Sequence, residues 1–421
     1  MEVIVCLERK VSFLSVQADV VVAGGGASGI LAAILCARNQ RKVIILEQKE
    51  KIGKKILATG NGKCNYTNLE QCEEYYHSLE KGFVELGLQE FGPREVISFF
   101  EELGIYPKNK NGYIYPYSEQ AASLLQVFEM ELQRLNVLVV CQEQIKKIEK
   151  KKHNFFVKTN KNEYQAKNVI MAMGGQASPK LGSDGSGFYF ASKIGHAIEA
   201  PVPALIGLKC QEDYFSLVSG VRTEAEVSVY IEGVKECVAK NLGELQLTNY
   251  GVSGIPVFQV SRFAARALHE GKKVFVCIDY MPHLKKEELV LLLEKRFFCE
   301  GKTAEQALVG LFSQKLIPVF LQQGGIRKDM KANKIKAMQI VQLATKIKGM
   351  RNVVYDTNGF ENAQVTAGGV ATKEIEKSTM ESKIISGLYF VGEIMDVDGI
   401  CGGYNLQWCW SSAYLAAKAI G

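Results

Sequence analysis

Apolar and polar positions along the chain repeat with different periods, and the changes of period predict strands and helices. Residues 19–23 form an apolar, β-branched run after one acid, which is typical of a buried strand. A glycine-rich turn follows at 24–29, and residues 30–38 are apolar enough for a buried helix. A second apolar strand at 42–46 ends in the acid Glu47. Strand, turn, helix, strand and acid in this order predict a βαβ unit that binds a dinucleotide.

Each glycine of this turn has a predicted physical role. Gly24 permits the tight turn after the strand, Gly26 lets a pyrophosphate approach the backbone, and Gly29 lets the helix lie close to the sheet. The helix that starts near Ala27 directs unpaired N–H groups and its positive dipole end at that phosphate. Glu47 is placed to accept hydrogen bonds from an adenosine ribose, which favours FAD or NAD over NADP. A membrane span is the alternative for this stretch, and three successive glycines argue against it.

Two later segments are expected at the same edge of the sheet. Residues 51–68 are rich in Gly, Asn, Thr and Lys, so they predict a loop that wraps the pyrophosphate and reaches the flavin; a solvated surface turn is the alternative. The apolar strand within 164–175 ends in Ala172-Met173-Gly174-Gly175 and returns the chain to the cofactor side. A second glycine-rich stretch, 182–187, lacks the fingerprint spacing, and we interpret it as a loop leading into a helix at 188–194, not as a second nucleotide site.

The middle of the chain has a different character. The segment 105–118 carries four tyrosines and predicts an aromatic hairpin, which would either line a pocket for a flat apolar substrate or pack against the main sheet. From about residue 201, strand-like alternation is followed by helices with lysines outside, which predicts a separate α+β insert.

The end of the chain repeats the logic of its beginning. An apolar strand at 387–391 ends in Gly392-Glu393, a glycine-rich turn follows, and an apolar helix begins near Gly403. Glu393 would meet a polyol such as ribitol, and the N-terminus of the helix would face a ring that gains negative charge on reduction. Asp396, Asp398 and Cys401 lie in the turn, but a mixed carboxylate–thiol set has no clear coordination geometry, so we predict no metal site.

Composition narrows the class of protein. The 421 residues suffice for two or three domains, and 47% hydrophobic with 23% charged residues exclude a disordered chain. The net charge is only +6, and the one dense lysine run, 146–152, predicts an exposed hairpin turn. A nucleic-acid surface would need a broader basic face with aromatic platforms, so we expect no nucleic-acid partner.

Cysteine usage and the first residues bear on location. Eleven cysteines without a CxxC pair favour reduced thiols in a cytoplasm over a disulfide framework or a zinc site. Residues 1–17 lack the continuous apolar region of a signal peptide, and we expect an extra edge strand or an appendage there.

Together these stretches resemble the BaiN/YhiN-like flavoprotein family, which includes a 3-dehydro-bile-acid Δ4,6-reductase and proteins described as aminoacetone-oxidase-like. The resemblance covers nearly the whole chain and rests on residues 24–29, 54–68, 173–175, 248–256 and 392–407. It implies an α/β fold: a discontinuous Rossmann-like FAD-binding domain with an inserted α+β domain, a β-barrel plus helices. We place the FAD-binding parts at 1–200 and 351–421 and the substrate-side insert at 201–350. The chain departs from the family pattern at Met173, Asn249 and Ile255.

The resemblance also implies a binding site. The backbone of Ile145 would touch adenine, Glu393 and Asp396 would hold the ribitol side, and residues 404–406 would stabilise N1 and O2 of the reduced flavin. The full expected FAD-binding set is Gly24, Gly26, Ala27, Ser28, Gly29, Glu47, Gln48, Lys54, Thr59, Gly60, Asn61, Cys64, Asn65, Ile145, Ala172, Gly174, Gly392, Glu393, Asp396, Gly403, Tyr404, Asn405 and Leu406. The catalytic residue stays open, with Asn249, Tyr250 and Tyr404 as candidate proton donors.

The activity implied is that of an FAD-dependent oxidoreductase acting on CH–CH groups, an ene-reductase that uses NADH or NADPH. Its substrate would be a conjugated 3-oxo bile acid or steroid, reduced at the Δ4,6 bonds. Two alternatives stay open: a flavin-dependent amine or aminoketone oxidase using O2, and a non-catalytic flavin-binding or RNA-modification accessory protein. We further expect a small apolar substrate, no membrane insertion and a cytoplasmic location, and the oligomeric state stays open.

Overall fold

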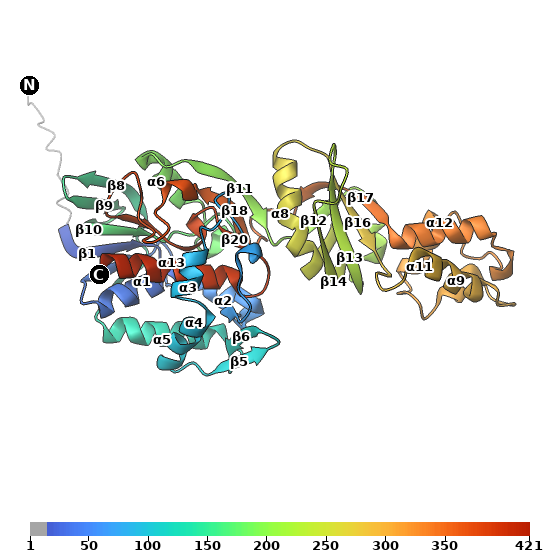
Figure 1. Cartoon of the computed structure of the whole chain (residues 1–421), viewed down its shortest axis with the longest axis horizontal. Helices are drawn as coiled ribbons and strands as arrows, with labels where there is room; N and C mark the ends of the chain where they lie inside the picture. Colours follow the sequence, from blue (N-terminus) through green and yellow to red (C-terminus); the bar gives the residue numbers. More distant parts are fainter. Residues whose placement is uncertain (1–14) are drawn as a thin grey trace, which may run out of the picture. The chain divides into compact units, whose positions relative to one another are not determined.

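The computed structural model describes residues 15–421, which form two compact units (Figure 1). One unit contains the chain up to Pro201 and from Gly368 to Gly421, and the other contains Val202–Ala367. The expected appendage at 1–17 falls mostly outside the described residues; residues 15–17 begin the first strand. The insert ends at 367, beyond the expected boundary at 350, because the strand Met350–Thr357 closes its barrel.

The discontinuous unit is built on a seven-stranded sheet in the order β7-β2-β1-β10-β9-β8, with β19 also paired to β10. These strands are β1 (Ser15–Ala23), β2 (Val43–Leu46), β7 (Leu138–Val140), β8 (Ile145–Lys151), β9 (Asn154–Thr159), β10 (Glu163–Met171) and β19 (Leu388–Phe390). Pairing is parallel from β7 through β10 to β19, whereas β8 and β9 are antiparallel. Every residue of β2 is buried, as expected for a parallel strand covered on both faces.

Helices and short strands surround this sheet; β3, β6 and β5 form a separate sheet, and β4 pairs with β20. The helices are α1 (Ala27–Arg38), α2 (Lys54–Ala58), α3 (Glu85–Glu90), α4 (Pro93–Glu102), α5 (Ala121–Arg134), α6 (Ser186–Ile194) and α13 (Tyr404–Ile420). The short strands are β3 (Thr67–Asn68), β4 (Tyr76–His77), β5 (Pro107–Lys110), β6 (Tyr113–Pro116) and β20 (Asp398–Gly399). Single 3-10 turns lie at Thr59–Gly62, Glu73–Tyr75, Pro179–Leu181, Thr372–Glu374 and Gly392–Ile394.

The continuous unit is a closed six-stranded barrel in the order β12-β15-β14-β13-β16-β17, followed by helices, so the expected barrel-plus-helices insert is confirmed. Its strands are β12 (Leu208–Cys210), β13 (Arg222–Ile231), β14 (Ala239–Thr248), β15 (Gly251–Gly254), β16 (Val274–Asp279) and β17 (Met350–Thr357). Its helices are α7 (Phe215–Val218), α8 (Ile255–His269), α9 (Lys286–Phe297), α10 (Ala304–Leu308), α11 (Leu316–Gln323) and α12 (Ala337–Lys348), with a 3-10 turn at Ala332–Lys334.

Each unit has its own apolar core. Alternate residues of β13, such as Ala225, Val227 and Val229, are fully buried, which is the period-2 pattern that predicted the strand. The chain passes between the units twice, through β11 (Ile198–Ala204) and β18 (Val365–Val370), which pair as a two-stranded sheet.

Candidate functional site

The first glycine turn connects β1 to α1 and is shaped by two close backbone approaches. Gly24 has φ +108°, and a Cβ atom there would lie 2.4 Å from the Ala172 carbonyl oxygen. A Cβ atom on Gly29 would lie 2.0 Å from the Gly24 carbonyl oxygen, so α1 packs against the turn as expected. Gly26 differs from both, because its φ of −84° is ordinary and a Cβ atom would meet nothing within 4 Å. The turn therefore holds open space at the one glycine expected to face a pyrophosphate.

Glu47 closes this turn from the end of β2. Its Oε2 accepts the Gly25 N–H at 2.9 Å and its Oε1 accepts the Lys49 N–H at 2.8 Å. The carboxylate is thus fixed by the backbone on both oxygens. Since each carboxylate oxygen has a second lone pair, ribose hydroxyl groups could still donate to it. The sequence reasoning assigned Glu47 but not Gly25, whose N–H group orients it.

The second glycine-rich stretch, 182–187, lies beside Glu47. The Gln48 Nε2 donates to the Gly182 carbonyl oxygen at 2.8 Å and to Asp184 Oδ2 at 3.1 Å. A Cβ atom on Gly182 would lie 3.9 Å from Glu47 Oε1. Residues 182–185 form a loop as expected, whereas Ser186 and Gly187 already belong to α6, and the position of this loop beside Glu47 was not predicted. Its place after the carboxyl end of a parallel strand was the available signal.

Other expected residues of the nucleotide side gather around the same turn. The Ala172 N–H donates to the Ala23 carbonyl oxygen at 2.9 Å, which sets the end of β10 next to the turn. Gly174 has φ +71°, and a Cβ atom there would lie 2.5 Å from Ser183 Oγ. Ile145 opens β8 two residues after Glu143, whose N–H donates to the Glu47 carbonyl oxygen at 3.0 Å.

The helix α13 runs parallel to α1, and its N-terminus extends beyond the N-terminus of α1. Near the start of α1, Ser28 Oγ donates to the Val391 carbonyl oxygen at 3.3 Å, and the next residue, Gly392, donates its N–H to Ser412 Oγ at 2.9 Å. Past the far end of α1, Arg41 Nε donates to the Gly421 carbonyl oxygen at 2.7 Å. From Ser412 back to Tyr404 is eight residues, or about 12 Å of helix. Two helix N-termini, neither capped by a side chain, are therefore staggered along one direction.

The loop 59–65 packs against the start of α13. Gly60, Asn61, Gly62 and Cys64 all have positive φ, so the loop is tightly coiled. A Cβ atom on Gly403, whose φ is +98°, would lie 2.9 Å from Asn65 Oδ1 and 2.7 Å from the Thr67 carbonyl oxygen. Asn65 Oδ1 is buried and has no hydrogen-bond partner among residues 15–421. A buried acceptor without a donor marks a place where a ligand group would fit.

Charged side chains of the site form one specific pair. Lys55 Nζ lies 2.6 Å from Glu393 Oε2 and links α2 to the turn after β19. Lys54, the expected lysine, instead pairs with Glu50 at 2.8 Å near the surface. Lys55 was therefore missed, and the adjacent lysines gave no signal to separate them. Asp396 is buried, and its Oδ2 accepts the Leu79 N–H at 3.4 Å.

The first turn of α13 also shows which atoms remain available. Asn405 Oδ1 accepts the Gly399 N–H and its Nδ2 donates to the Gly399 carbonyl oxygen, both at 2.8 Å. Its side chain thus fixes the preceding turn. The backbone N–H groups of residues 404–406, which have no partner within the helix, are the donors available to a ligand. Burial raises the pKa of the Tyr404 phenol, and burial raises the pKa of the Cys64 and Cys401 thiols to about 12, so all three stay protonated near neutral pH.

The three candidate proton donors are divided between the units. Tyr404 belongs to the discontinuous unit, whereas Asn249 and Tyr250 lie between β14 and β15 of the barrel. Within the barrel unit, the Tyr250 hydroxyl lies 2.7 Å from the position of a Cβ atom on Gly207. Among residues 15–421, no group of three His, Cys, Asp or Glu side chains is placed to hold a metal ion, and no helix is long and apolar enough to cross a membrane.

Comparison with known proteins identifies the family. The model of the HI0933-like protein Rossmann domain matches residues 18–419. The chain belongs to this family. A curated relative, the 3-dehydro-bile acid delta(4,6)-reductase of Clostridium scindens, is 44% identical over 401 residues, which is 94% of this chain and 98% of the relative. The expected family resemblance is confirmed, and this HI0933-like chain is an oxidoreductase.

Two further relatives carry a different name. Ribosomal RNA dihydrouridine synthase of Haemophilus influenzae is 30% identical, covering 97% of this chain and 99% of the relative. The protein of the same name from Escherichia coli is 28% identical, covering 95% and 97%. The expected exclusion of nucleic acid therefore loses its support.

Proposed function

We propose that this chain is an FAD-dependent reductase of C=C bonds conjugated to a carbonyl group, with a 3-oxo-4,6-diene bile acid as substrate and NADH or NADPH as electron donor. The 44% identity to a 3-dehydro-bile acid delta(4,6)-reductase, over nearly the full length of both chains, supports the proposed substrate. The amine oxidase alternative has no supporting observation among these relatives.

The residues present fit FAD on three observations. Gly26 leaves open space at the N-terminus of α1, where backbone N–H groups would hold a pyrophosphate. The N-terminus of α13 lies about 12 Å further along, a separation suited to the ribitol chain between pyrophosphate and ring. Asn65 Oδ1 is a buried acceptor without a donor beside Gly403, at the end expected to meet the ring.

Bound FAD, once reduced by NADH or NADPH, would supply a hydride to an electron-poor alkene. The chain would bind its pyrophosphate at residues 26–29 and its ribose at Glu47, and Glu393 would hold the ribitol side while paired with Lys55. Backbone N–H groups of residues 404–406 would stabilise negative charge on the pyrimidine edge of the ring. A protonated phenol that donates to the substrate carbonyl would polarise the alkene, and Tyr404 remains a proposal for that role.

A second candidate function is the reduction of uracil in RNA. Dihydrouridine is uridine whose C5=C6 bond is saturated, and that bond is conjugated to a ring carbonyl like the alkene of a 3-oxo bile acid. One site chemistry would therefore serve both substrates. Two relatives named ribosomal RNA dihydrouridine synthase favour this candidate, although their identity to the chain is lower.

Anaerobic flavin absorbance tests the proposal. The purified protein should be yellow, bleach with NADH or NADPH, and recover its colour on addition of a 3-oxo-4,6-diene bile acid, with a product 4 Da heavier when both bonds are reduced. A saturated 3-oxo bile acid is the matched control and should leave the flavin bleached. Recovery with ribosomal RNA transcript alone would favour the second candidate. Recovery only in air, with peroxide that the diene does not suppress, would contradict the reductase and favour an oxidase.

A further inference from the structure

The aromatic hairpin β5–β6 stands apart from the main sheet and pairs with β3 beside the candidate site. The hairpin is not hydrogen-bonded to the main sheet, but its buried Ile114 belongs to the same apolar core as the main-sheet strands. A Cβ atom on Gly402 would lie 2.7 Å from Tyr113 Cε1, and one on Gly60 would lie 3.8 Å from Tyr115 Cε1. The hairpin thus adjoins both the start of α13 and the loop 59–65.

One face of this hairpin is made only of tyrosine and lysine. In the register of the two strands, Lys108 lies opposite Tyr115 and Lys110 lies opposite Tyr113. The Tyr117 N–H donates to the Tyr106 carbonyl oxygen, which sets these two tyrosines opposite each other. Because strand residues alternate between faces, these three cross-strand pairs share one side, while Ile114 and Pro116 are buried on the other. We call these six residues the tyrosine–lysine face: Tyr106, Lys108, Lys110, Tyr113, Tyr115 and Tyr117.

The tyrosine–lysine face is open to solvent. Tyr106 is 70% exposed, Tyr117 is 62% exposed and Tyr113 is 41% exposed. The Tyr106 and Tyr117 rings lie 5.5 Å apart, and Lys108 Nζ is 5.4 Å from the Tyr117 ring centre. Exposed aromatic rings interleaved with cations are the platform that single-stranded nucleic acid uses, because bases stack on the rings and phosphates pair with the lysines. This platform is narrow, so it differs from the broad basic face that is expected of a nucleic-acid surface.

We infer that the tyrosine–lysine face binds single-stranded RNA and leads it to the candidate site. Successive pairs on an antiparallel hairpin are about 7 Å apart, roughly twice the 3.4 Å rise per nucleotide of a stacked strand. A strand with bases splayed apart would therefore place one base on each pair. The Tyr113 end adjoins Gly402 at the site, and the Tyr106–Tyr117 end points outward along the strand. Two pairs combine a tyrosine ring with a lysine and the third combines two tyrosine rings, a repeat that suits a polymer better than one rigid steroid.

Glu119 holds the lysines of this face in the unbound protein. Its carboxylate pairs with Lys108, with Lys110 at 2.9 Å and with Lys63 at 3.5 Å, so three cations share one acid. Hydrogen bonds from Lys108 and Lys110 lower the pKa of the Glu119 carboxyl to about 2. Phosphate groups would compete with Glu119 for the same cations. Removal of its charge would therefore strengthen RNA binding, an effect that misfolding cannot produce.

Fluorescence anisotropy of the FAD-loaded full chain with a labelled 12-nucleotide oligouridylate tests the inference in 0.15 M KCl. We expect the single strand to bind at least about tenfold tighter than a 12-base-pair RNA duplex. Tyr106→Ala and Tyr117→Ala should each weaken binding about tenfold. Tyr189→Ala is the matched control, because Tyr189 is 58% exposed and lies under Lys193 but far along the chain on α6, and it should change binding less than about twofold.

Two variants sharpen this test. Glu119→Gln should tighten oligouridylate binding about two- to fivefold, and Lys108→Gln should reduce the salt slope of binding by about 0.7. The inference is overturned by absent oligouridylate binding, by equal loss in the Tyr189 control, or by tyrosine variants that raise KM for the bile acid while oligouridylate does not compete. The inference that RNA binds this face depends on the proposed function in one respect only, the candidate site to which the RNA is led. Failure to reduce bile acid would sink that function and leave RNA binding intact.

Discussion

The two glycine turns, at 24–29 and at 402–406, begin parallel helices but are built in different ways. The first turn is closed mainly by its own βαβ unit, since Gly29 meets Gly24 and Glu47 accepts from Gly25; its one distant contact here is that of Gly24 with Ala172, after β10. The second turn is closed by distant segments, because Gly402 meets Tyr113 and Gly403 meets Thr67 and Asn65. One helix start is thus encoded mainly locally, and the other depends on tertiary contacts.

The largest expected effect comes from filling the close approaches. Gly29→Ala places a methyl group 2.0 Å from the Gly24 carbonyl oxygen, and Gly403→Ala adds a methyl group 2.7 Å from the Thr67 carbonyl oxygen at a positive φ. Each should lower the free energy of unfolding by about 3 kcal/mol or more. Thermal denaturation measures this loss. A variant as stable as the wild type would show that the backbone relaxes freely at that turn.

Gly26→Ala tests cofactor affinity separately from the stability of the fold. Its φ is ordinary and the added methyl group meets nothing within 4 Å, so the FAD-free protein should keep its stability. If a pyrophosphate occupies the open space, FAD affinity should fall by about tenfold or more. Gly349→Ala in the barrel unit is the control, because its Cβ atom would make only ordinary contacts at 3.6 and 3.7 Å. Unchanged FAD titration of Gly26→Ala would place the pyrophosphate elsewhere.

Asn65→Ala tests the second turn in the same way. The side-chain amide oxygen of Asn65, Oδ1, has no partner among the described residues, so its removal should lower the stability of the FAD-free protein only slightly. In the FAD complex, the loss of a hydrogen bond from the ligand should weaken affinity by about 1 kcal/mol, or roughly fivefold. Calorimetric titration with FAD gives this value. Equal affinity would mean that the buried acceptor meets water and not the cofactor.

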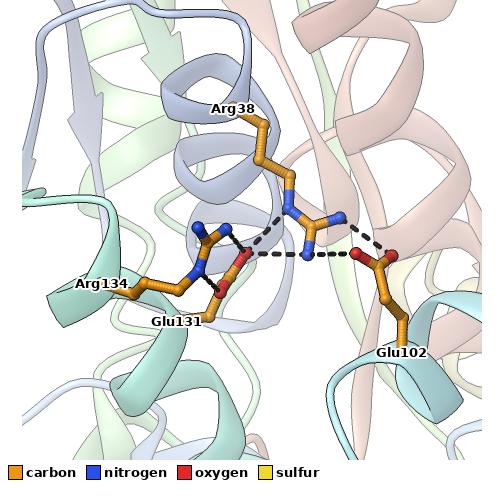
Figure 2. Close-up of polar contacts among 4 residues, drawn as sticks. All are labelled: Arg38, Glu102, Glu131 and Arg134. Carbon is orange, nitrogen blue, oxygen red and sulfur yellow. Dashed lines mark hydrogen bonds and ion pairs between the residues drawn. The ribbon is translucent and has the colours of Figure 1, made fainter.

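The smallest expected effect on stability comes from the ion pairs that join α1 to α4 and α5. Figure 2 shows Arg38 of α1 joined to Glu131 of α5 at 2.8 Å and to Glu102 of α4, with Arg134 also on Glu131. Hydrogen bonds from the two arginines, above all from Arg134, lower the pKa of the buried Glu131 carboxyl. Because both arginines are partly exposed to solvent, Glu131→Gln should lower stability by only about 0.5–1 kcal/mol near neutral pH.

The pH dependence of that loss has a defined sign. Because the folded pKa of Glu131 is below its unfolded value of about 4.5, the wild-type advantage is complete above that value. It disappears as pH falls through the lowered folded pKa. Denaturant unfolding of wild type and Glu131→Gln at pH 7 and below pH 4 measures both limits. A difference that persists in acid would assign the loss to packing.

How much the sequence predicts follows the same division between local and distant contacts. The βαβ unit, the role of Gly29 and Glu47 follow from spacing, since their partners lie within about 25 residues, whereas the contact of Gly24 with Ala172 is distant in sequence. The barrel insert follows from alternation and family resemblance. By contrast, Lys55 facing Glu393 across 338 positions, and the loop at Gly182 beside Glu47, depend on how segments meet in space. The tyrosine–lysine face was hidden because cross-strand register, which no composition encodes, decides which side chains share a surface.

The double passage of the chain through β11 and β18 has a consequence for assembly. The barrel unit is one uninterrupted segment, so it has all its partners as soon as that segment emerges from the ribosome. The other unit waits for β19 and α13, which are synthesised after the entire insert. The strand β10 therefore spends that interval without β19, which pairs with its last three residues, Val169–Met171. A cofactor that spans both helix starts would bind only after the last of these elements has folded into place.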